Sequence, residues 1–416
     1  MNNIVYKRLV KNSVSLGFVT LINLGVPLIV IPLLVKSIGI KDFGIIAFSQ
    51  AILSYLSMLC DYSFNITATR IIGSIKSKDE INRYTSEVVY TKVFLAIVGL
   101  LFVFVFLIAS NNESILLISI ICLSVIPYSI QNNWFYIGTE RSTMLPLWNV
   151  FGKGFMLLTV VLIYSLGELT SYTYAIIYII SIMITSIFNI VKLNKICNGL
   201  EIPKFGSIKG QILNGLNIFI STLSASGYRN FPVIVMGGFN INPAYIGAYS
   251  LVERVVRVIT NIIQPISQAC VPVASKKYAT DIKIGLIFST KVLLLFLVLS
   301  LFSIILLHLF SSEIIYYFTN DNDILVHDIW NVLIYIPVVV AISNVLGVLT
   351  LINLGLEKQF NYSIAITGLT GVSLSILASM IKPELMTYVV IWCEFQVMLF
   401  MSYYLIRHLN KTKRNY

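Results

Sequence analysis

Charged residues are scarce in this sequence. Only 11% of the 416 residues are charged and only 18 are acidic, whereas soluble domains carry about 25% charged residues. Hydrophobic residues make up 57% of the chain. A soluble domain of this composition is excluded, because too few charges are available to cover its surface. The sequence therefore predicts an integral membrane protein whose main solvent is lipid.

Cysteine and histidine are also rare. The five cysteines lie singly with no C-x-x-C pair, and the three histidines form no H-E-x-x-H helix. This pattern indicates neither a disulfide framework nor a metal centre, and we expect no cofactor. The formal net charge of +11 does not indicate nucleic-acid binding, because the basic residues lie in short segments between apolar runs.

Apolar runs dominate what is present. The run at 13–35 is too long for the apolar region of a signal peptide and lacks an A-x-A cleavage site, so we expect a retained first helix. Including this run, segments of spanning length are predicted near 12–35, 43–72, 84–109, 114–137, 144–166, 171–191, 211–237, 244–275, 284–310, 325–352, 360–381 and 386–406.

The order of these segments predicts an all-α integral membrane protein with twelve transmembrane helices in two six-helix bundles around a central cavity. The N-terminal bundle covers 1–200, with a polar hinge at 192–210, and the C-terminal bundle with its basic tail covers 211–416. A weak internal repeat at a shift of about 200 residues, which sets Pro32 opposite Pro232, favours parallel topology of the two halves.

The basic residues between the spans predict the orientation. With a cytoplasmic N-terminus, twenty of the 29 basic residues fall on the cytoplasmic side and three fall outside. Because cytoplasmic loops of membrane proteins are enriched in Lys and Arg, both termini are predicted to be cytoplasmic. A bacterial cell inner membrane is the expected location.

The remaining six basic residues fall inside predicted spans, where a charge costs at least a few kcal/mol unless it faces a packed interior or a wet cavity. The segment 244–275 carries two of them, Arg254 and Arg257, together with Glu253. Glu253 and Arg257 are spaced i,i+4 and share a helix face. One interpretation is a structural ion pair with a snorkelling Arg254; the other is an anion site, since guanidinium groups bind phosphate bidentately. We favour the anion site.

Lys153 and Arg229, both deep in their spans, are predicted to add positive charge along the same cavity. Lys92 is a further candidate substrate-binding cation, although Lys92 and Lys291 lie near enough to the cytoplasmic ends for their ammonium groups to snorkel to the headgroups. Glu253 and Asp61 are candidate gating or coupling residues. Acidic residues within spans either relay protons or neutralise neighbouring cations, and the sequence does not decide between these roles.

Several motifs resemble those of one family. The stretch Ile31-Pro32-Leu33-Leu34-Val35, with Ile38-Gly39 and Asp42-Phe43-Gly44 after it, resembles the opening of O-antigen flippases of the Wzx type. Tyr62 to Thr69 is similar to that family's Y-G-F-N-x-T-A-T stretch, with Ser63 in place of glycine. Further matches are Trp134 to Glu140, and Pro265-Ile266-Ser267-Gln268 with Pro272.

The resemblance implies membership of the multidrug/oligosaccharidyl-lipid/polysaccharide flippase superfamily, with twelve helices around a cationic cavity. It implies a transporter and not an enzyme, with an undecaprenyl-diphosphate-linked oligosaccharide as substrate and the lipid bilayer as its surroundings. A polysaccharide polymerase and a chain-length regulator in the same membrane are the expected partners. Two alternatives stay open: a multidrug antiporter of the same superfamily, and a membrane-bound oligosaccharide polymerase.

Overall fold

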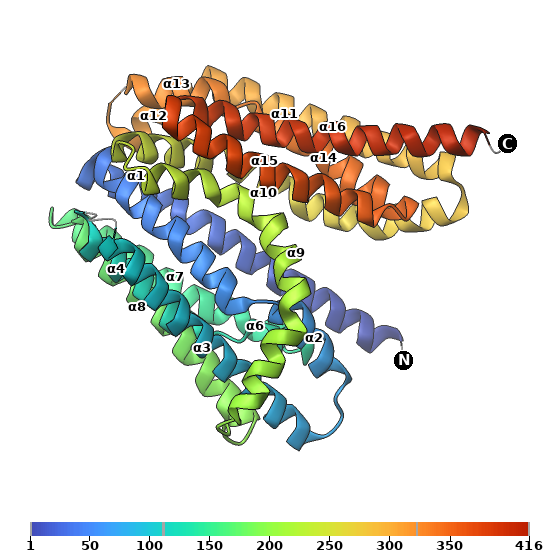
Figure 1. Cartoon of the computed structure of the whole chain (residues 1–416), viewed down its shortest axis with the longest axis horizontal. Coiled ribbons are helices and arrows are strands. Elements are labelled where there is room, and N and C mark those ends of the chain that lie inside the picture. Colours follow the sequence, from blue (N-terminus) through green and yellow to red (C-terminus); the bar gives the residue numbers. More distant parts are fainter. Residues whose placement is uncertain (1, 110–112, 322, 415–416) are drawn as a thin grey trace. The chain divides into compact units, whose positions relative to one another are not determined.

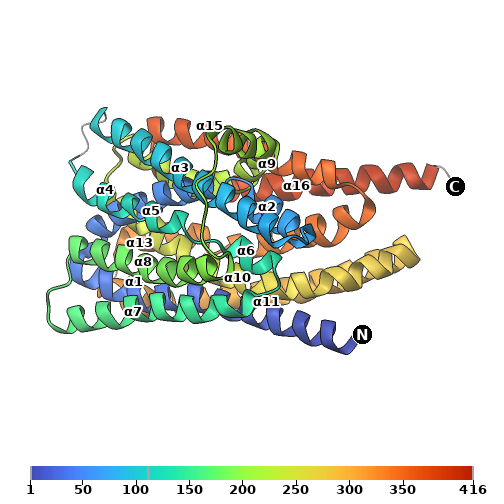
Figure 2. The ribbon, with the colours of Figure 1, turned by 90° about the horizontal axis from the view of Figure 1, so that it is seen from below.

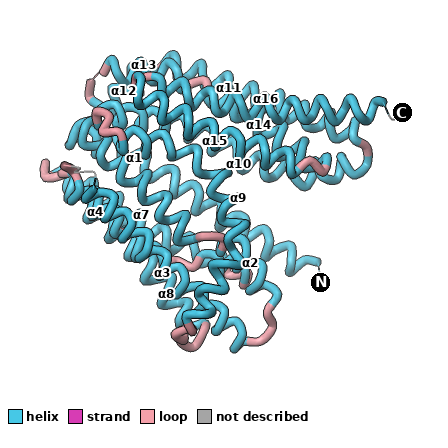
Figure 3. The backbone as a smooth tube through the Cα atoms, in the orientation of Figure 1, coloured by secondary structure: helices cyan, strands magenta, loops and turns pink. Residues whose placement is uncertain are grey.

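The fold was taken from a computed structural model, which describes residues 2–109, 113–321 and 323–414; the side chains of 2–18, 20–21, 221, 224–229 and 412–414 lie outside that description. The described chain is helical and contains no strand, and short loops join its helices (Figure 3). The expected all-α class is confirmed. The chain divides into two compact units, 1–223 and 224–416, called unit 1 and unit 2 below.

Unit 1 is built from the helices α1 to α8 and the first part of α9 (Figure 1). Their bounds are α1 Asn2–Asp61, α2 Phe64–Ser74, α3 Lys78–Ala109, α4 Ile115–Leu123, α5 Val125–Ser129, α6 Asn133–Gly138, α7 Leu145–Ser165, α8 Ser171–Ile196 and α9 Phe205–Gly238. Unit 2 contains the rest of α9 with α10 Pro243–Thr280, α11 Ile282–Leu309, α12 Ser311–Thr319, α13 Ile324–Leu333, α14 Ile336–Asn344, α15 Glu357–Ile381 and α16 Leu385–Arg414.

The predicted spans coincide with helical segments but differ in detail, and the span expected at 43–72 is interrupted between the end of α1 and the start of α2. The loop expected between the first two spans is only a kink at Gly39, whose φ of 80° suits glycine because residues with a Cβ atom rarely adopt a positive φ. The span expected at 114–137 is broken into α4, α5 and α6. The span expected at 325–352 comprises α13, α14 and a π-helical turn at Val345–Leu351. Breaks of this kind at membrane depth are tolerated where the backbone is buried in protein or lines a wet cavity.

Nine helical segments in the described chain are long and apolar enough to cross a membrane. The first of these merges the two expected N-terminal spans across the Gly39 kink. The helices α9 and α10 are outside this group. Their membrane crossing, and with it the full count of twelve, stays a prediction.

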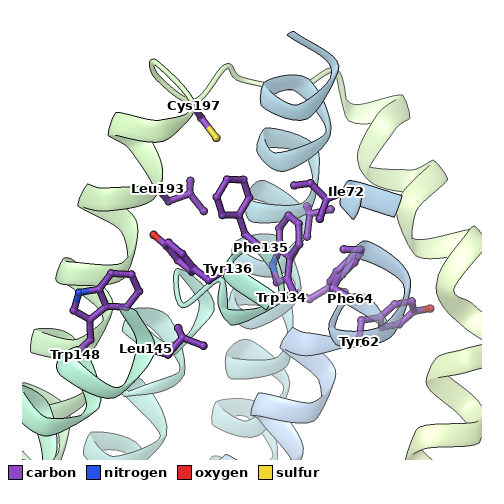
Figure 4. Packing of buried hydrophobic residues seen from close by; sticks show 13 residues of the cluster. Tyr62, Phe64, Ile72, Trp134, Phe135, Tyr136, Leu145, Trp148, Leu193 and Cys197 are labelled. Carbon is purple, nitrogen blue, oxygen red and sulfur yellow. The ribbon is translucent and has the colours of Figure 1, made fainter. Parts of the chain in front are cut away.

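An aromatic cluster holds the broken helix in unit 1 (Figure 4). Trp134, Phe135 and Tyr136 of α6 are fully buried, and the close-up shows them between α2 on one side and Leu193 of α8 on the other. The Trp134 indole N–H donates to Asn132 Oδ1 at 3.1 Å, and the Tyr136 hydroxyl donates to a carbonyl oxygen of α8 at 2.6 Å. Because buried aromatic residues with satisfied polar atoms are held rigidly, this cluster fixes the segment that precedes α6.

The helices α7 and α8 pack closely against each other (Figure 2). A Cβ atom at Gly152 of α7 would overlap Thr185 Oγ1 and lie 2.7 Å from the Ser181 carbonyl oxygen. The Ser181 hydroxyl donates to the Gly152 carbonyl at 2.8 Å across this contact. Glycine at this position therefore lets the backbones approach, as small residues do in membrane helix pairs.

The boundary between the two compact units falls inside α9, after Leu223. The first part of α9 packs on unit 1: Phe219 stacks on Tyr62 with ring centroids 4.5 Å apart, and Gln211 donates to Glu87 at 3.0 Å. The polar segment that was predicted to be the hinge, 192–210, comprises the end of α8, a loop, and the start of α9.

Candidate functional site

A cavity of about 640 Å³ lies within unit 1. Its walls come from α1, α2, α5, α7, α8 and the first part of α9, together with the break before α6 and the first residue of α6. Polar side chains are prominent in its lining: Asn23, Gln50, Asp61, Asn65, Tyr128, Gln131, Asn133, Asn149, Lys153, Tyr178 and Thr185. A chamber of this size is in the range of ligand sites, about 300–1,000 Å³, but it is more polar than most of them.

Lys92 and Asp61 form a buried ion pair at the edge of this cavity. Lys92 Nζ lies 3.0 Å from Asp61 Oδ1 and donates to the Gln131 carbonyl at 2.6 Å, and the lysine side chain is 1% exposed. Asp61 Oδ2 also accepts from the Tyr128 hydroxyl at 2.7 Å and from Asn65 Nδ2 at 3.1 Å. The carboxylate is therefore fully satisfied, as a buried charge must be.

This pair changes the interpretation of Lys92. The prediction that the Lys92 ammonium group snorkels to the headgroups is wrong, because Lys92 is enclosed by protein and is neutralised by a carboxylate. Lys92 also does not line the cavity, whereas Asp61 does. The pairing joins α3 to the end of α1 and holds Gln131 through its backbone carbonyl.

Lys153 lies in the cavity wall on α7, one helical turn after Asn149. No carboxylate forms an ion pair with Lys153 in the part of the chain whose side chains are described. Since Asp61 is already paired with Lys92, Lys153 supplies the uncompensated charge in this cavity wall. An ammonium group in such a position attracts an anion and repels a cation.

A second charged cluster lies in unit 2, on α10 and α16. Arg257 Nε donates to Glu253 Oε1 at 2.6 Å, so the ion pair expected from their spacing is present. Glu394 of α16 also acts electrostatically on Arg257, and one oxygen of this buried carboxylate has no hydrogen-bond partner among the described residues. Arg257 therefore interacts with two carboxylates, Glu253 on its own helix and Glu394 on α16, whereas the sequence had placed only Glu253 beside it.

The structure thus brings together three of the candidate residues, Lys92, Asp61 and Lys153, around one cavity in unit 1. It places Glu253, Arg254 and Arg257 on one helix of unit 2. The side chain of Arg229 lies outside the described residues. Sequence reasoning missed the amide side chains of the cavity, because Asn and Gln in an apolar run carry no charge signal.

The long apolar helices, with a polar cavity among them, define a multi-pass membrane protein. By its sequence the chain belongs to the polysaccharide biosynthesis protein family, whose profile matches residues 9–278. A relative from Escherichia coli (strain K12), named "Putative O-antigen transporter", is 26% identical over 375 residues, which cover 88% of each chain. A relative of the same name from Shigella dysenteriae is 26% identical over 287 residues, covering 66% of this chain and 70% of the relative.

Two solved structures have a similar fold. A multidrug resistance MATE family transporter of the MOP superfamily, in an inward-facing conformation, aligns with a TM-score of 0.70 at 14% identity, covering 95% of this chain and 96% of the other. The lipid II flippase MurJ, in an inward closed conformation, aligns with a TM-score of 0.69 at 14% identity, covering 95% of this chain and 87% of the other. The chain therefore shares the fold of these two membrane proteins.

Proposed function

We propose that this protein is a flippase that moves an undecaprenyl-diphosphate-linked repeat unit of O-antigen or polysaccharide from the cytoplasmic to the periplasmic leaflet by alternating access. The observation that carries the proposal is the polar cavity of unit 1, in which Lys153 supplies positive charge without an ion-pair partner among the described residues. A diphosphate is the matching anion, and sugar hydroxyls match the amide-rich wall. The O-antigen transporter name of the relatives supports this substrate class.

We assign the residue roles as part of this proposal. Lys153 attracts the diphosphate. Lys92 and Asp61 hold the cavity wall in position, and a change in their pairing is the proposed gating step. Arg254, Arg257 and Arg229 are proposed as further cations for the diphosphate during the cycle, with Arg257 released from Glu253 at that stage. The lipid tail stays in the bilayer throughout.

A multidrug antiporter is the weaker alternative, because the usual cationic drugs are repelled by the positive charge of Lys153. A polymerase is weaker still, since a catalytic domain needs a sizeable loop. The longest of the fully described loops between helices is the segment between Ile196 and Phe205. We place the protein in the bacterial inner membrane with both termini cytoplasmic, which a reporter fused to the C-terminus can test.

Deleting the gene is expected to abolish surface polysaccharide and to leave lipid-linked single units in the cytoplasmic leaflet. The physical reason is that a charged diphosphate with its sugars does not cross the hydrocarbon layer unaided. The measurement is the extraction of lipid-linked units combined with glycan labelling from the periplasmic side. Single units that accumulate in the periplasmic leaflet would indicate a polymerase instead, and undiminished polysaccharide would rule out a transport role.

Replacing Glu253 with Gln is expected to keep substrate bound but to slow its translocation and to weaken the pH dependence. The carboxylate is proposed to hold Arg257 when no diphosphate is present, and an amide of the same shape lacks that charge. Binding and translocation are measured in vesicles with lipid-linked oligosaccharide across a pH series. Glu87→Gln is the control, because Glu87 pairs at the same spacing with Arg83, whose side chain is 77% exposed, and a glutamine at 87 can still accept from Gln211. If Glu253→Gln behaves like this control at every pH, Glu253 is a structural counter-charge only.

A further inference from the structure

Three amide side chains of the unit-1 cavity are held by the protein through their NH2 groups. Asn65 donates to Asp61 Oδ2 at 3.1 Å, Asn149 donates to the Leu145 carbonyl at 2.9 Å, and Gln131 donates to Ser186 Oγ at 3.0 Å. They come from α2, α7 and the break before α6, so distant parts of unit 1 contribute them.

The chemistry of the partners fixes which way each amide faces. A carboxylate and a backbone carbonyl only accept hydrogen bonds, so Asn65 and Asn149 must present their NH2 groups to them. The Ser186 hydroxyl already donates its proton to a backbone carbonyl at 2.7 Å, and it can therefore only accept from Gln131. The side-chain carbonyl oxygens of the three amides therefore remain available to accept hydrogen bonds from a ligand.

These three oxygens have no donor among the described residues of the protein. A ligand that satisfies them must bring several O–H or N–H groups, and a saccharide brings hydroxyl groups in many directions. A phosphoryl group cannot do so, because its oxygens would repel the amide oxygens. Lys153 follows Asn149 by four residues and so lies on the same face of α7, which places an anion-binding group beside a hydroxyl-binding group.

We infer that the unit-1 cavity recognises the sugar that is attached directly to the diphosphate, with the carbonyl oxygens of Asn65, Gln131 and Asn149 accepting from its hydroxyl groups. The inference rests on the proposed function. It assigns recognition of the sugar to uncharged residues. The cavity then selects the lipid-linked saccharide by its hydroxyl groups as well as by the charge of its diphosphate.

The test compares two probes on the purified full-length protein in detergent. One probe is the lipid-linked repeat unit extracted from cells that lack this protein, and the other is undecaprenyl diphosphate without sugar. Asn149→Ala is expected to weaken binding of the first probe about two- to tenfold, which corresponds to the loss of one hydrogen bond, and to leave binding of the second unchanged. Gln131→Ala is expected to act in the same way.

Asn353 of unit 2 offers a matched control. Its amide makes the same bond to the backbone four residues earlier, at 2.9 Å, but its carbonyl oxygen already accepts from Ser275 and it lies outside the cavity. Asn353→Ala should leave both affinities unchanged. A thermal melt of each variant verifies that it is folded.

Three results would overturn the inference. If Asn149→Ala weakens the binding of both probes equally, the amide belongs to the diphosphate site. If folded Asn149→Ala and Gln131→Ala proteins bind both probes as tightly as the unaltered protein does, the amides have a structural role only. If the unaltered protein binds neither probe, the proposed function itself fails, and this outcome is distinguishable because it does not depend on a variant.

Discussion

Lys92→Met is expected to destabilise the protein by about 3–5 kcal/mol, because it leaves the Asp61 carboxylate without its cation inside the bundle. Asp61→Asn should have a comparable effect, since it leaves a buried ammonium group without a counter-charge, among neutral partners such as the Gln131 carbonyl and the face of Tyr128. The pair joins α3 to the end of α1, so its loss also loosens the wall of the unit-1 cavity.

The double variant Lys92→Met/Asp61→Asn is expected to recover most of the lost stability. Removing both charges removes the need to compensate either, and the amide oxygen that replaces the carboxylate can still accept from Tyr128. Thermal melting in detergent, followed by tryptophan fluorescence, measures all three variants, and Trp134 and Trp148 report on unit 1 itself.

Arg83→Ala is the control for this cycle. Arg83 also belongs to an ion pair, but its side chain is 77% exposed, and a surface pair contributes about 0–1 kcal/mol. If the effects of Lys92→Met and Asp61→Asn simply add in the double variant, the two residues are not coupled and the structural role given to the pair is wrong.

Lys153→Met is expected to reduce translocation at least about tenfold while stability holds or rises. Most substitutions of buried charges destabilise a protein because they leave a partner charge behind, but Lys153 has no ion-pair partner among the described residues. Removing its ammonium group also removes the cost of keeping that charge out of bulk water. The loss of transport reflects the lost attraction for the diphosphate, worth about 1.4 kcal/mol for each factor of ten.

Lys153→Arg should retain part of the activity, because the charge survives with a different hydrogen-bonding geometry. Translocation is measured in vesicles containing the lipid-linked unit, and stability is measured by thermal melting. Lys291→Met is the matched control, since this lysine also falls in a predicted span but is exposed on α11. A Lys153→Met protein that transports normally would remove the observation on which the proposed function rests.

The helical membrane class could be predicted from composition and from the lengths of the apolar runs. Both properties belong to each segment by itself and do not depend on which helices pack against it, because lipid requires every backbone group to be satisfied within a helix. The Glu253–Arg257 pair could be predicted for a similar reason: residues four apart on a helix meet whatever the tertiary structure is.

The helix breaks were harder to predict. The expected loop at 36–42 is reduced to one residue with positive φ, Gly39, and the span at 114–137 is interrupted before α6. Hydropathy averaged over a whole span does not resolve these breaks, although the second one falls at the polar residues Gln131, Asn132 and Asn133. Asn189 of α8 makes the second break possible, since its side chain accepts from the Asn132 backbone N–H at 2.9 Å and donates to Asn133 at 3.2 Å.

The sequence by itself determined the class of the protein, the apolar segments and the pairs that are close along one helix. Only the tertiary structure decided that Lys92 pairs with Asp61 on another helix and that Lys153 is left without such a partner among the described residues. It also decided that Asn65, Gln131 and Asn149 share one cavity. The physical reason is that local hydrogen bonding and lipid set the helices, whereas the partner of a charge and the accessible side of an amide depend on which helix faces pack together.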